Sequence, residues 1–435
     1  MKNTTPISVF WFRRDLRLND QAALFHALKG PHPVLPIFIF DRNILDRLNN
    51  KRDRRVEFIH LQLRKIKEQL QQMGSDLLIQ YGEPLQVWKE LLDTYTVAGV
   101  YTNHDYEPYA MQRDEEVNKL LTAHQVPFYT FKDQVIFEKD EVLSATAKPY
   151  TVYTPYSNMW LKTFSQTDIP VYSTSSLFPN FQRSYTFPII SLEDIGFHAA
   201  GISFPSSTTT DSIIANYAEQ RNTPSVIGTS HLGIHLRFGT ISVRELVNHA
   251  MQFEKTFLKE LIWREFFMQI LWHHPHVIDQ PFKKQYDKIE WRTDEKDFEK
   301  WCQGKTGYPI VDAGMRELNE TGFMHNRVRM ITASFLCKHL FIDWRWGEAY
   351  FAEKLLDFEL SANNGNWQWV AGTGCDAAPY FRIFNPTEQQ KKFDPQAKYI
   401  RQWVKEFDTL DYARPMVDHV FARERALKGY AVLKA

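Results

Sequence analysis

The first 135 residues alternate short apolar runs with segments of helical periodicity, and this alternation constrains the fold more than any other feature. The apolar runs are typical of strands. The predicted strands are 7–11, 34–40, 76–80, 99–102 and 127–131, and the predicted helices between them are 20–28, 53–73, 83–93 and 109–124. Alternation with short connections predicts a doubly wound parallel sheet, so we expect a Rossmann-like α/β domain.

A change of composition separates this part from the rest of the chain. From 173 to 212 the sequence is rich in Ser, Thr, Pro and Phe without a period, which indicates a linker. Beyond it strand signals almost vanish, and helical periodicity occurs at 255–271, 308–320, 325–340 and 348–356. A chain of 435 residues exceeds the usual size of a single core. We therefore expect an α/β domain over 1–135, an interdomain linker over 136–212 and an all-α domain over 213–435.

Charge and cysteine content restrict the class of protein. The 52 Lys and Arg residues balance the 52 Asp and Glu residues, so nucleic-acid binding would depend on a local basic rim. Cys302, Cys337 and Cys375 lack CxxC spacing, which predicts a reducing compartment without a disulfide framework, iron–sulfur cluster or other metal site. Because neither a signal region nor an apolar run of about 18 residues occurs, we expect a cytoplasmic protein without a membrane span.

Tryptophan is concentrated in the C-terminal half. Nine of the 12 tryptophans lie from Trp263 to Trp403, and two of them, Trp367 and Trp369, close the Asn- and Gly-rich stretch 363–369. Paired indoles beside a predicted bend suggest stacking or electron transfer. Core packing explains most buried indoles, however, so composition alone does not establish a redox chain.

The predicted helix around 260–266 has a polar face that could bind a ligand. Glu260, Trp263 and Arg264 fall at i, i+3 and i+4 and therefore share one face. A carboxylate, an indole and a guanidinium together suit a polar aromatic ligand that carries phosphate. The opposite, buried face would consist of Leu258, Leu261, Ile262 and Phe266. An amphipathic helix with an internal ion pair explains the same pattern.

Two shorter motifs are weaker signals. In 321–330, Asn326 and Met330 lie one helical turn apart and could form a polar face with Arg329, although a solvated helix start is the simpler interpretation. The loop 228–233 (Gly-Thr-Ser-His-Leu-Gly) could hold a phosphate through hydroxyls and backbone N–H groups, or could simply cap a helix.

Taken together, these stretches resemble the photolyase/cryptochrome family, and specifically the class I cyclobutane pyrimidine dimer (CPD) photolyases. Further segments that are similar to the family are 10–20, 304–313, 329–336 and 376–386. The resemblance covers nearly the whole chain in order and is densest from 260 to 386.

The resemblance implies a U-shaped FAD inside the all-α domain. Asn363 would face flavin N5, and Arg329 with Asp357 would form an ion pair beside the ring. The other residues implied to bind the cofactor are Tyr217, Thr229, Ser230, His231, Leu232, Gly233, Arg264 and Glu359.

The resemblance also implies light-driven repair of CPDs, by electron transfer from excited reduced FAD to a flipped-out lesion. Trp263 and Trp369 would offer flat faces to the fused pyrimidines, while Glu260 and Asn326 would hydrogen-bond their edges beside Met330. The tryptophans implied to reduce the flavin are Trp301, Trp344 and Trp367.

UV-damaged DNA containing such dimers is the expected partner of an expected monomer. Arg221, Arg327 and Arg382 are candidate contacts to DNA phosphates, which position the duplex without reading its sequence. Binding should therefore weaken steeply with salt.

Several positions depart from the family pattern. Asp357-Phe358-Glu359 stands where Asp-Gly-Asp is usual, and Asn366 replaces a glycine before Trp367. Phe323 and Phe257 replace tryptophans near the flavin and the lesion. We expect altered flavin tuning with FAD binding retained.

The segment 103–109 is similar to the loop of members that bind a flavin-type antenna, FMN or 8-hydroxy-5-deazaflavin. A folate antenna is not expected, because Tyr109-Ala110 stands where folate-binding members have Asn-Glu. The absence of any antenna is the alternative.

Three other functions are alternatives. A (6-4) photolyase is expected to have paired histidines in the lesion pocket, whereas this chain has Asn326 and Met330 there. A cryptochrome-like light sensor would signal through a partner, whereas the retained Glu260, Trp263 and Trp369 favour repair. A flavoprotein electron carrier would keep the scaffold without the lesion pocket.

Overall fold

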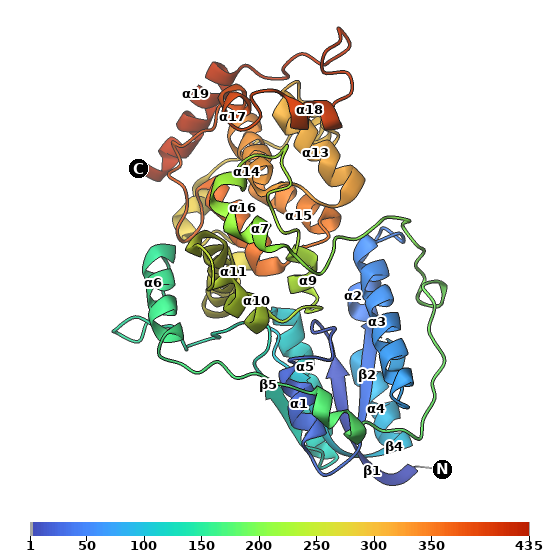
Figure 1. Ribbon diagram of the computed structural model, residues 1–435. Helices are drawn as coiled ribbons and strands as arrows, with labels where there is room; N and C mark the ends of the chain where they lie inside the picture. Colours follow the sequence, from blue (N-terminus) through green and yellow to red (C-terminus); the bar gives the residue numbers. More distant parts are fainter. Residues whose placement is uncertain (1–2, 435) are drawn as a thin grey trace. The chain divides into compact units, whose positions relative to one another are not determined.

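The computed structural model describes residues 3–434, and the chain divides into two compact units. The first, called the sheet unit, consists of Met1–Glu138, Phe164–Ser207 and Leu232–His249. The second, called the helical unit, consists of Lys139–Thr163, Thr208–His231 and Ala250–Ala435. Figure 1 shows the elements of both units. The three domain ranges expected from the sequence stay a prediction.

The sheet unit contains the predicted parallel sheet. Its strands are β1 (Asn3–Phe12), β2 (Val34–Asp41), β3 (Leu78–Gly82), β4 (Tyr95–Asn103) and β5 (Phe128–Phe131). They are ordered β3-β2-β1-β4-β5, with Trp11 opposite Ile37 and Phe10 opposite Tyr101. All neighbouring strands are parallel, and the order reverses between β1 and β4. The doubly wound α/β prediction is therefore confirmed.

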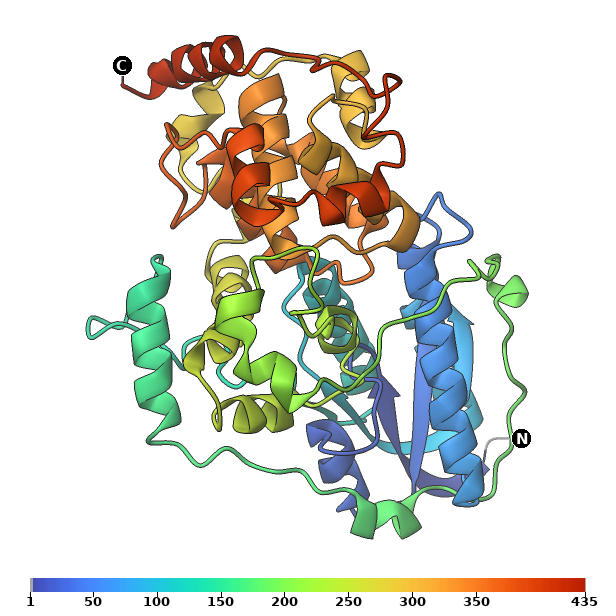
Figure 2. The ribbon, with the colours of Figure 1, turned by 45° about the horizontal axis from the view of Figure 1, so that its top comes forward.

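Helices cover both faces of this sheet. One face packs on α4 (Pro84–Thr94) and α5 (Pro108–Ala123) through a core that includes Trp11, Trp88 and Leu121. Right-handed crossovers put α1 (Ala22–Leu28) and α3 (Arg54–Gln72) on the other face, as Figure 2 shows. The remaining elements of this unit are α2 (Arg42–Leu45), η1 (Ser175–Asn180), η2 (Glu193–Ile195), α9 (Gly233–Arg237) and α10 (Val243–Ala250).

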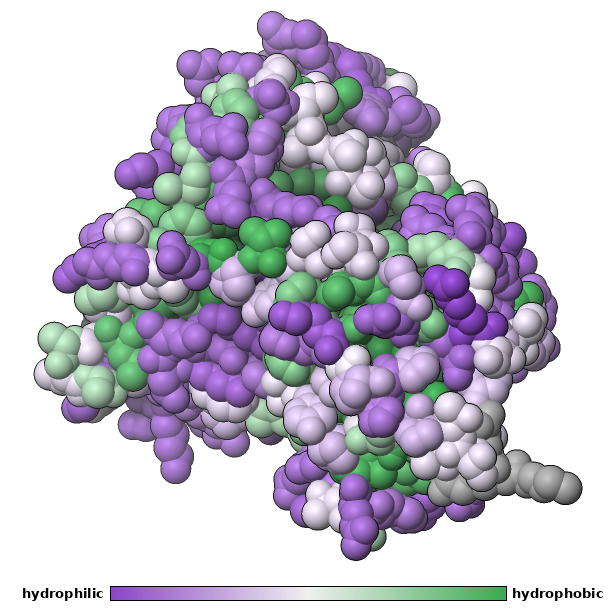
Figure 3. Space-filling view, turned by 60° about the horizontal axis from the view of Figure 1, so that its bottom comes forward, coloured by the Kyte–Doolittle hydropathy of each residue, from purple (hydrophilic) through white to green (hydrophobic). Residues whose placement is uncertain are grey.

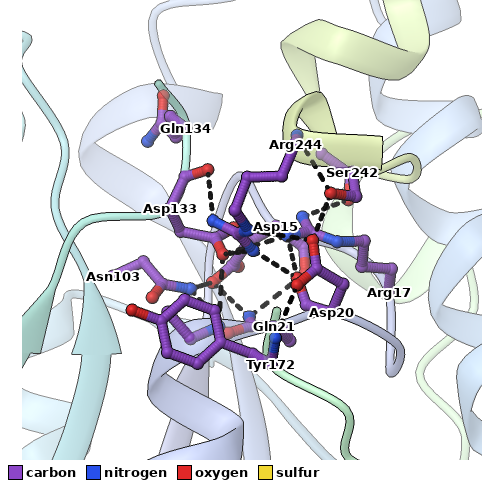
Figure 4. Close-up of polar contacts among 12 residues, drawn as sticks. Asp15, Arg17, Asp20, Gln21, Asn103, Asp133, Gln134, Tyr172, Ser242 and Arg244 are labelled. Carbon is purple, nitrogen blue, oxygen red and sulfur yellow. Dashed lines mark hydrogen bonds and ion pairs between the residues drawn. The ribbon is translucent and has the colours of Figure 1, made fainter. Parts of the chain in front are cut away.

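A buried polar cluster lies at the carboxyl ends of β1 and β4 (Figure 4). Arg244, in α10, donates to Asp20 at 2.9 Å and to Asp133 at 2.8 Å, and Arg17 also donates to Asp133 at 2.8 Å. The cluster also includes Asp15, Gln21, Asn103 and Ser242. Buried charges are tolerated only when they are paired and hydrogen-bonded. These pairs hold a segment remote in sequence against the sheet.

The named elements of the helical unit are all helices (Figures 1 and 2). They are α6 (Tyr153–Phe164), α7 (Asp211–Ala215), α8 (Tyr217–Gln220), α11 (Lys255–His273), η3 (Pro275–Ile278), η4 (Lys284–Lys288), α12 (Glu295–Cys302), α13 (Pro309–Thr321), α14 (Asn326–Ser334), η5 (Phe335–Leu340), α15 (Trp344–Lys354), α16 (Leu360–Ala371), α17 (Pro386–Phe393), α18 (Lys398–Trp403), α19 (His419–Tyr430) and η6 (Ala431–Lys434). The main core includes Trp301, Ile331, Trp344 and Trp367. The expected all-α architecture is confirmed.

The structure overturns two local expectations. Helix α6 lies inside the range predicted as linker, and its Trp160 Nε1 donates to Glu265 of α11 at 2.6 Å. The predicted bend at 363–366 is part of the continuous helix α16, which ends at Gly372 with a φ of 88°. In both cases contacts with other elements outweigh weak local helix propensity.

The surface carries no extended apolar face in the view of Figure 3, where hydrophilic residues predominate and apolar ones lie singly or in small groups. Such scattering is normal for a folded protein surface. Among residues 3–434, no helix combines the length and the apolar character that crossing a bilayer requires.

Candidate functional site

A cavity of about 390 Å³ in the helical unit collects most of the predicted site residues. Its walls come from α8, α11, α14, α15 and α16 and from the segment 355–359. The predicted residues that line it are Tyr217, Arg221, Glu260, Trp263, Arg264, Asn326, Arg327, Arg329, Met330, Asp357, Glu359, Asn363, Trp367 and Trp369. Residues that the sequence separates widely are therefore neighbours around one space.

The other predicted residues lie outside the wall that residues 3–434 form around this cavity. These are Thr229, Ser230, His231, Leu232, Gly233, Trp301, Trp344 and Arg382. Leu232 and Gly233 belong to the sheet unit, and Arg382 is exposed in the loop between α16 and α17. His231 stacks on Phe323 with ring centroids 4.1 Å apart, and burial lowers the pKa of its imidazole. Any phosphate at this loop would therefore depend on hydroxyls and backbone N–H groups rather than on a histidine charge.

Two walls of the cavity meet at Gly365. A Cβ atom at this position of α16 would lie 2.1 Å from Cδ1 of Phe267 in α11, far inside van der Waals contact. Only glycine lets the two helices approach this closely. The glycine thus brings Asn363 and Trp369 on α16 towards the same space as Trp263 on α11.

Arg329 and Asp357 form the ion pair that the family resemblance implies. Arg329 Nη2 donates to Asp357 Oδ2 at 2.9 Å, and its Nε donates to the Met324 carbonyl at 2.7 Å. The guanidinium also lies over Phe323, 5.6 Å from the ring centroid. Asp357 Oδ1 is buried and has no hydrogen-bond partner among residues 3–434. An unsatisfied acceptor in a cavity wall fits a ligand with a ring N–H donor, as the flavin of FAD has.

Asn363 is oriented by Glu348, a residue that no sequence pattern revealed. Asn363 Nδ2 donates to the Glu348 carbonyl at 3.1 Å and to Glu348 Oε1 at 2.8 Å. Both amide hydrogens are thereby used, which leaves Oδ1 as the side-chain atom available to a ligand. Burial raises the pKa of Glu348, and the hydrogen bond from Asn363 partly opposes that shift.

The departures at Glu359 and Asn366 have local structural roles. Glu359 is the N-cap of α16, and its Oε2 accepts from Ala362 N at 2.9 Å and from Ser361 Oγ at 2.5 Å. Asn366 is exposed and donates from Nδ2 to the Ala362 carbonyl at 2.7 Å. The longer acid therefore begins the helix and the asparagine does not interrupt it.

The rim of the cavity is polar. Arg221 and Glu260 form an ion pair. Burial raises the pKa of Glu260, while the guanidinium of Arg221 lowers it in part. Arg327 donates to Asn222 Oδ1 at 2.7 Å and lies over the ring of Phe393, 4.6 Å from its centroid. Two of the three candidate DNA-binding arginines are thus held at the same rim.

Trp263 has a stacking partner from the unpredicted helix α6. The rings of Tyr153 and Trp263 are nearly parallel, at 6°, with centroids 3.6 Å apart. A helical pattern around 153–164 would have been the only sequence signal for Tyr153, and proline with poor helix formers obscures it.

The three predicted electron-transfer tryptophans all lie in the core. Trp301 and Trp367 touch edge to face with centroids 6.2 Å apart, and Trp301 Nε1 donates to the Thr332 carbonyl at 3.1 Å. Trp301, Trp344 and Trp367 are 0%, 1% and 2% exposed. An external reductant needs a more accessible ring, and Trp291 and Trp346 are partly buried tryptophans that pack against the same core.

Two family models match the chain. The model for the FAD binding domain of DNA photolyase matches residues 257–411, which contribute most of the cavity wall. The DNA photolyase model matches residues 8–174.

Known proteins are similar over almost the whole chain. The deoxyribodipyrimidine photo-lyase of Escherichia coli is 36% identical, with 97% of each chain covered, and that of Alkalihalophilus pseudofirmus is 35% identical, with 99% of each covered.

Among solved structures, a bacterial class III photolyase from Agrobacterium tumefaciens has a TM-score of 0.86 at 32% identity, with 100% of this chain and 99% of that chain covered. An archaeal photolyase from Sulfolobus tokodaii, solved with two FAD molecules, has a TM-score of 0.82 at 32% identity, with 97% and 99% covered. The cryptochrome of Synechocystis has a TM-score of 0.83 at 25% identity, with 98% and 100% covered. The chain therefore belongs to the photolyase/cryptochrome family.

Proposed function

We propose that this protein is a DNA photolyase, a carbon–carbon lyase that uses light to split CPDs in DNA. The curated relatives that cover nearly the whole chain are deoxyribodipyrimidine photo-lyases. The observation that carries the proposal is a single cavity that combines the Arg329–Asp357 ion pair with two indoles, Trp263 and Trp369. The ion pair suits a flavin ring, and the two indoles suit a flat lesion.

When FAD is bound, it supplies the one-electron transfer that opens the cyclobutane ring. Arg264, Arg329 and Asn363 would hold its ring and phosphates from the cavity wall, and the unpartnered Asp357 Oδ1 would accept from a ring N–H. Further contacts to the cofactor are proposed for Tyr217, Thr229, Ser230, His231, Leu232, Gly233 and Glu359. Trp367, with Trp301 and Trp344, would relay electrons for reduction of the cofactor.

The flipped lesion would enter the same cavity. Trp263 and Trp369 would present aromatic surface to the two pyrimidines, and Met330 would add a polarizable contact. Glu260 and Asn326 would hydrogen-bond the pyrimidine edges and stabilise charge that develops on their carbonyl groups. Because a dimer pairs weakly, its extrusion from the duplex costs less than that of intact bases, which supports selectivity.

UV-damaged DNA is the proposed partner of a monomeric protein. Arg221 and Arg327 at the cavity rim and the exposed Arg382 would contact phosphates. We also propose that the protein works in the cytoplasm, since all three cysteines have free thiols, as in a reducing compartment. Sedimentation equilibrium would test the monomer.

A flavin-type antenna, FMN or 8-hydroxy-5-deazaflavin, is proposed for the sheet unit. The carboxyl ends of β1 and β2 carry Trp11 and Asp41, and ligands of doubly wound folds bind at such ends. Arg113 lies 5.0 Å from the Trp11 ring, and Tyr109 donates to Asp41 at 2.6 Å. Absorption spectra of chromophores released from the purified protein would identify the antenna.

Repair of a defined lesion tests the function. Photoreduced protein mixed with an oligonucleotide that contains one thymine CPD should restore intact thymines under blue or near-UV light, as measured by chromatography. A dark sample and an oligonucleotide with a (6-4) lesion are the controls. No repair after complete flavin reduction would overturn the enzymatic function and favour a light sensor, whereas repair of the (6-4) lesion alone would assign the other photolyase class.

A substitution in the cavity tests the proposed lesion pocket. Trp263→Ala should weaken binding of the CPD oligonucleotide while FAD remains bound, because the indole is assigned to the lesion. Fluorescence anisotropy and flavin absorbance measure the two properties. Loss of FAD from this variant would instead assign the residue to the cofactor.

A further inference from the structure

One face of Trp263 is covered by Tyr153 of α6. The two rings are 6° from parallel and their centroids are 3.6 Å apart, which is full face-to-face contact. Tyr153 is buried, whereas Trp263 is half-buried and lines the cavity. Phe267 of α11 also packs on the indole, at 30° with centroids 5.4 Å apart, so Tyr153 supplies the closest and most nearly parallel of its two stacked neighbours.

Tyr153 is itself held at both ends. Its backbone N–H donates to Asp376 Oδ2 at 3.0 Å, and its hydroxyl donates to the Lys259 carbonyl of α11 at 2.8 Å. Phe266 meets both rings edge-on, with centroids 5.8 Å from Tyr153 and 5.5 Å from Trp263. A tyrosine anchored in this way cannot rotate with its neighbour, so it defines the plane of the indole.

Two other aromatic residues of α6 pack in the core instead. Tyr156 packs against Phe266, with centroids 5.2 Å apart, and Trp160 is fully buried and bonded to Glu265. Among the aromatic rings of α6, Tyr153 is the one that stacks on a cavity-lining indole in the described part of the chain. The packing of α6 on α11 thus places this one tyrosine against an indole that lines the cavity.

We propose that Tyr153 is a positioning residue for lesion recognition, which fixes the indole plane of Trp263 so that this ring is ready to receive the flipped dimer. This inference rests on the proposed photolyase function. Preorganisation of a flat binding surface increases affinity because the ligand does not have to order it. Helix α6 thereby becomes part of the lesion pocket.

The test compares damaged and undamaged DNA. Tyr153→Leu, which removes the flat partner, should raise the Kd for a CPD oligonucleotide about three- to tenfold, the range expected for one aromatic stack. The Kd for undamaged DNA, the FAD absorption spectrum and the repair rate at saturating lesion should stay as in the wild type. Tyr153→Phe, which keeps the stack and loses only the hydroxyl bond to Lys259, should recover most of the lesion affinity. If Tyr153→Leu does not fold, Tyr153→Met carries the same expectation.

Tyr156→Leu is the matched control, since it removes a ring of the same helix that packs on Phe266 and, within residues 3–434, makes no ring contact with Trp263. Unchanged lesion affinity in Tyr153→Leu, or an equal loss in Tyr156→Leu, would overturn the inference. If Trp263→Ala weakens lesion binding and Tyr153→Leu does not, only the positioning role fails. If the wild type itself does not distinguish damaged DNA, the proposed function fails.

Discussion

Two buried residues near the start of α14 have pKa values shifted in opposite directions. Burial raises the pKa of Glu317 to about 7, although its Oε2 accepts from the Tyr399 hydroxyl at 2.6 Å. Burial lowers the pKa of His325 to about 4, and its backbone N–H donates to Glu317 at 3.2 Å. Both side chains are thus mainly uncharged between about pH 4 and pH 7, which suits their burial away from solvent.

These shifts predict how stability depends on pH. For Glu317 the folded state holds the proton more tightly, so its contribution is present below pH 4.5 and is lost as pH rises towards 7. For His325 the contribution is present above pH 6.5 and is lost as pH falls towards 4. The Glu317 shift corresponds to about 3 kcal/mol.

Glu317→Gln should therefore remove the loss of stability that Glu317 causes as pH rises. Glutamine stays neutral at every pH, so the free energy of unfolding of the variant, relative to that of the wild type, should increase from pH 5 to pH 8. Urea denaturation at both pH values measures this difference. Glu320→Gln, an exposed position of the same helix, is the control and should retain the wild-type difference. An identical pH dependence in wild type and Glu317→Gln would contradict the prediction.

At the scale of single residues, the sequence located side chains with chemistry but not their supports. Glu260, Trp263 and Arg264 share one helical face, and all three line the cavity as that spacing predicts. Tyr153 and Glu348 were not predicted because each supports the site through a tertiary contact. Tyr153 stacks on Trp263, and Glu348 accepts a hydrogen bond from the Asn363 amide. Periodicity reports which face of an element is polar, but not which distant residue orients it.

At the scale of elements, α16 shows why local propensity was misleading. Its Asn and Gly residues are weak helix formers, and they predicted a bend. Asn363 instead donates to Glu348, Asn364 donates to the Ile278 carbonyl at 3.3 Å, and Gly365 admits Phe267. Each of these three residues makes a contact with another element that a better helix former could not make.

Helix α6 was missed for a similar reason. Pro155 stands in its first turn, where proline is tolerated, and Thr154, Ser157 and Asn158 are poor helix formers. Its stability comes from burial of Tyr156 and Trp160, which a single sequence cannot reveal. The strands of the sheet and the long helices with a clear apolar period were, in contrast, predictable.

Gly365→Ala tests the close approach of α16 and α11. The added methyl would lie 2.1 Å from Phe267, so overpacking should cost about 1–3 kcal/mol. The better helix propensity of alanine stabilises the folded state by at most about 1 kcal/mol, so the net effect of the substitution is destabilising. We expect a lower Tm and partial loss of FAD during gel filtration, read from the ratio of flavin to protein absorbance.

Asn366→Ala is the matched control for this change. Asn366 is the next residue of the same helix and is exposed, and within residues 3–434 its side chain bonds only to the Ala362 carbonyl of its own helix. Its replacement should leave the Tm near that of the wild type. If Gly365→Ala were as stable as Asn366→Ala, the helices would have to tolerate a wider separation than the glycine suggests.

At the scale of the whole molecule, a net charge of zero gives no general attraction to DNA. Binding of DNA must then depend on a few basic side chains at defined positions. Arg221 is paired with Glu260 and Arg327 is bonded to Asn222, so part of the charge at the rim is already engaged within the protein. The exposed Arg382 is the third candidate and the one outside the cavity wall that residues 3–434 form.

Salt dependence separates a placed phosphate contact from a general effect of charge. Each phosphate that the protein neutralises adds about 0.9 to the slope of log K against log salt, so Arg382→Gln should reduce that slope by about 1. The loss of affinity should be equal for damaged and undamaged DNA, because a phosphate contact does not read bases.

Arg423→Gln is the control, because it makes the same charge change at an exposed position of α19 and should leave the slope unchanged. Fluorescence anisotropy titrations at salt concentrations from roughly 50 to 200 mM would give the slopes for the wild type and the two variants. Equal slopes for the two variants would mean that DNA responds to the overall charge of the protein, and Arg382 would lose its assigned contact.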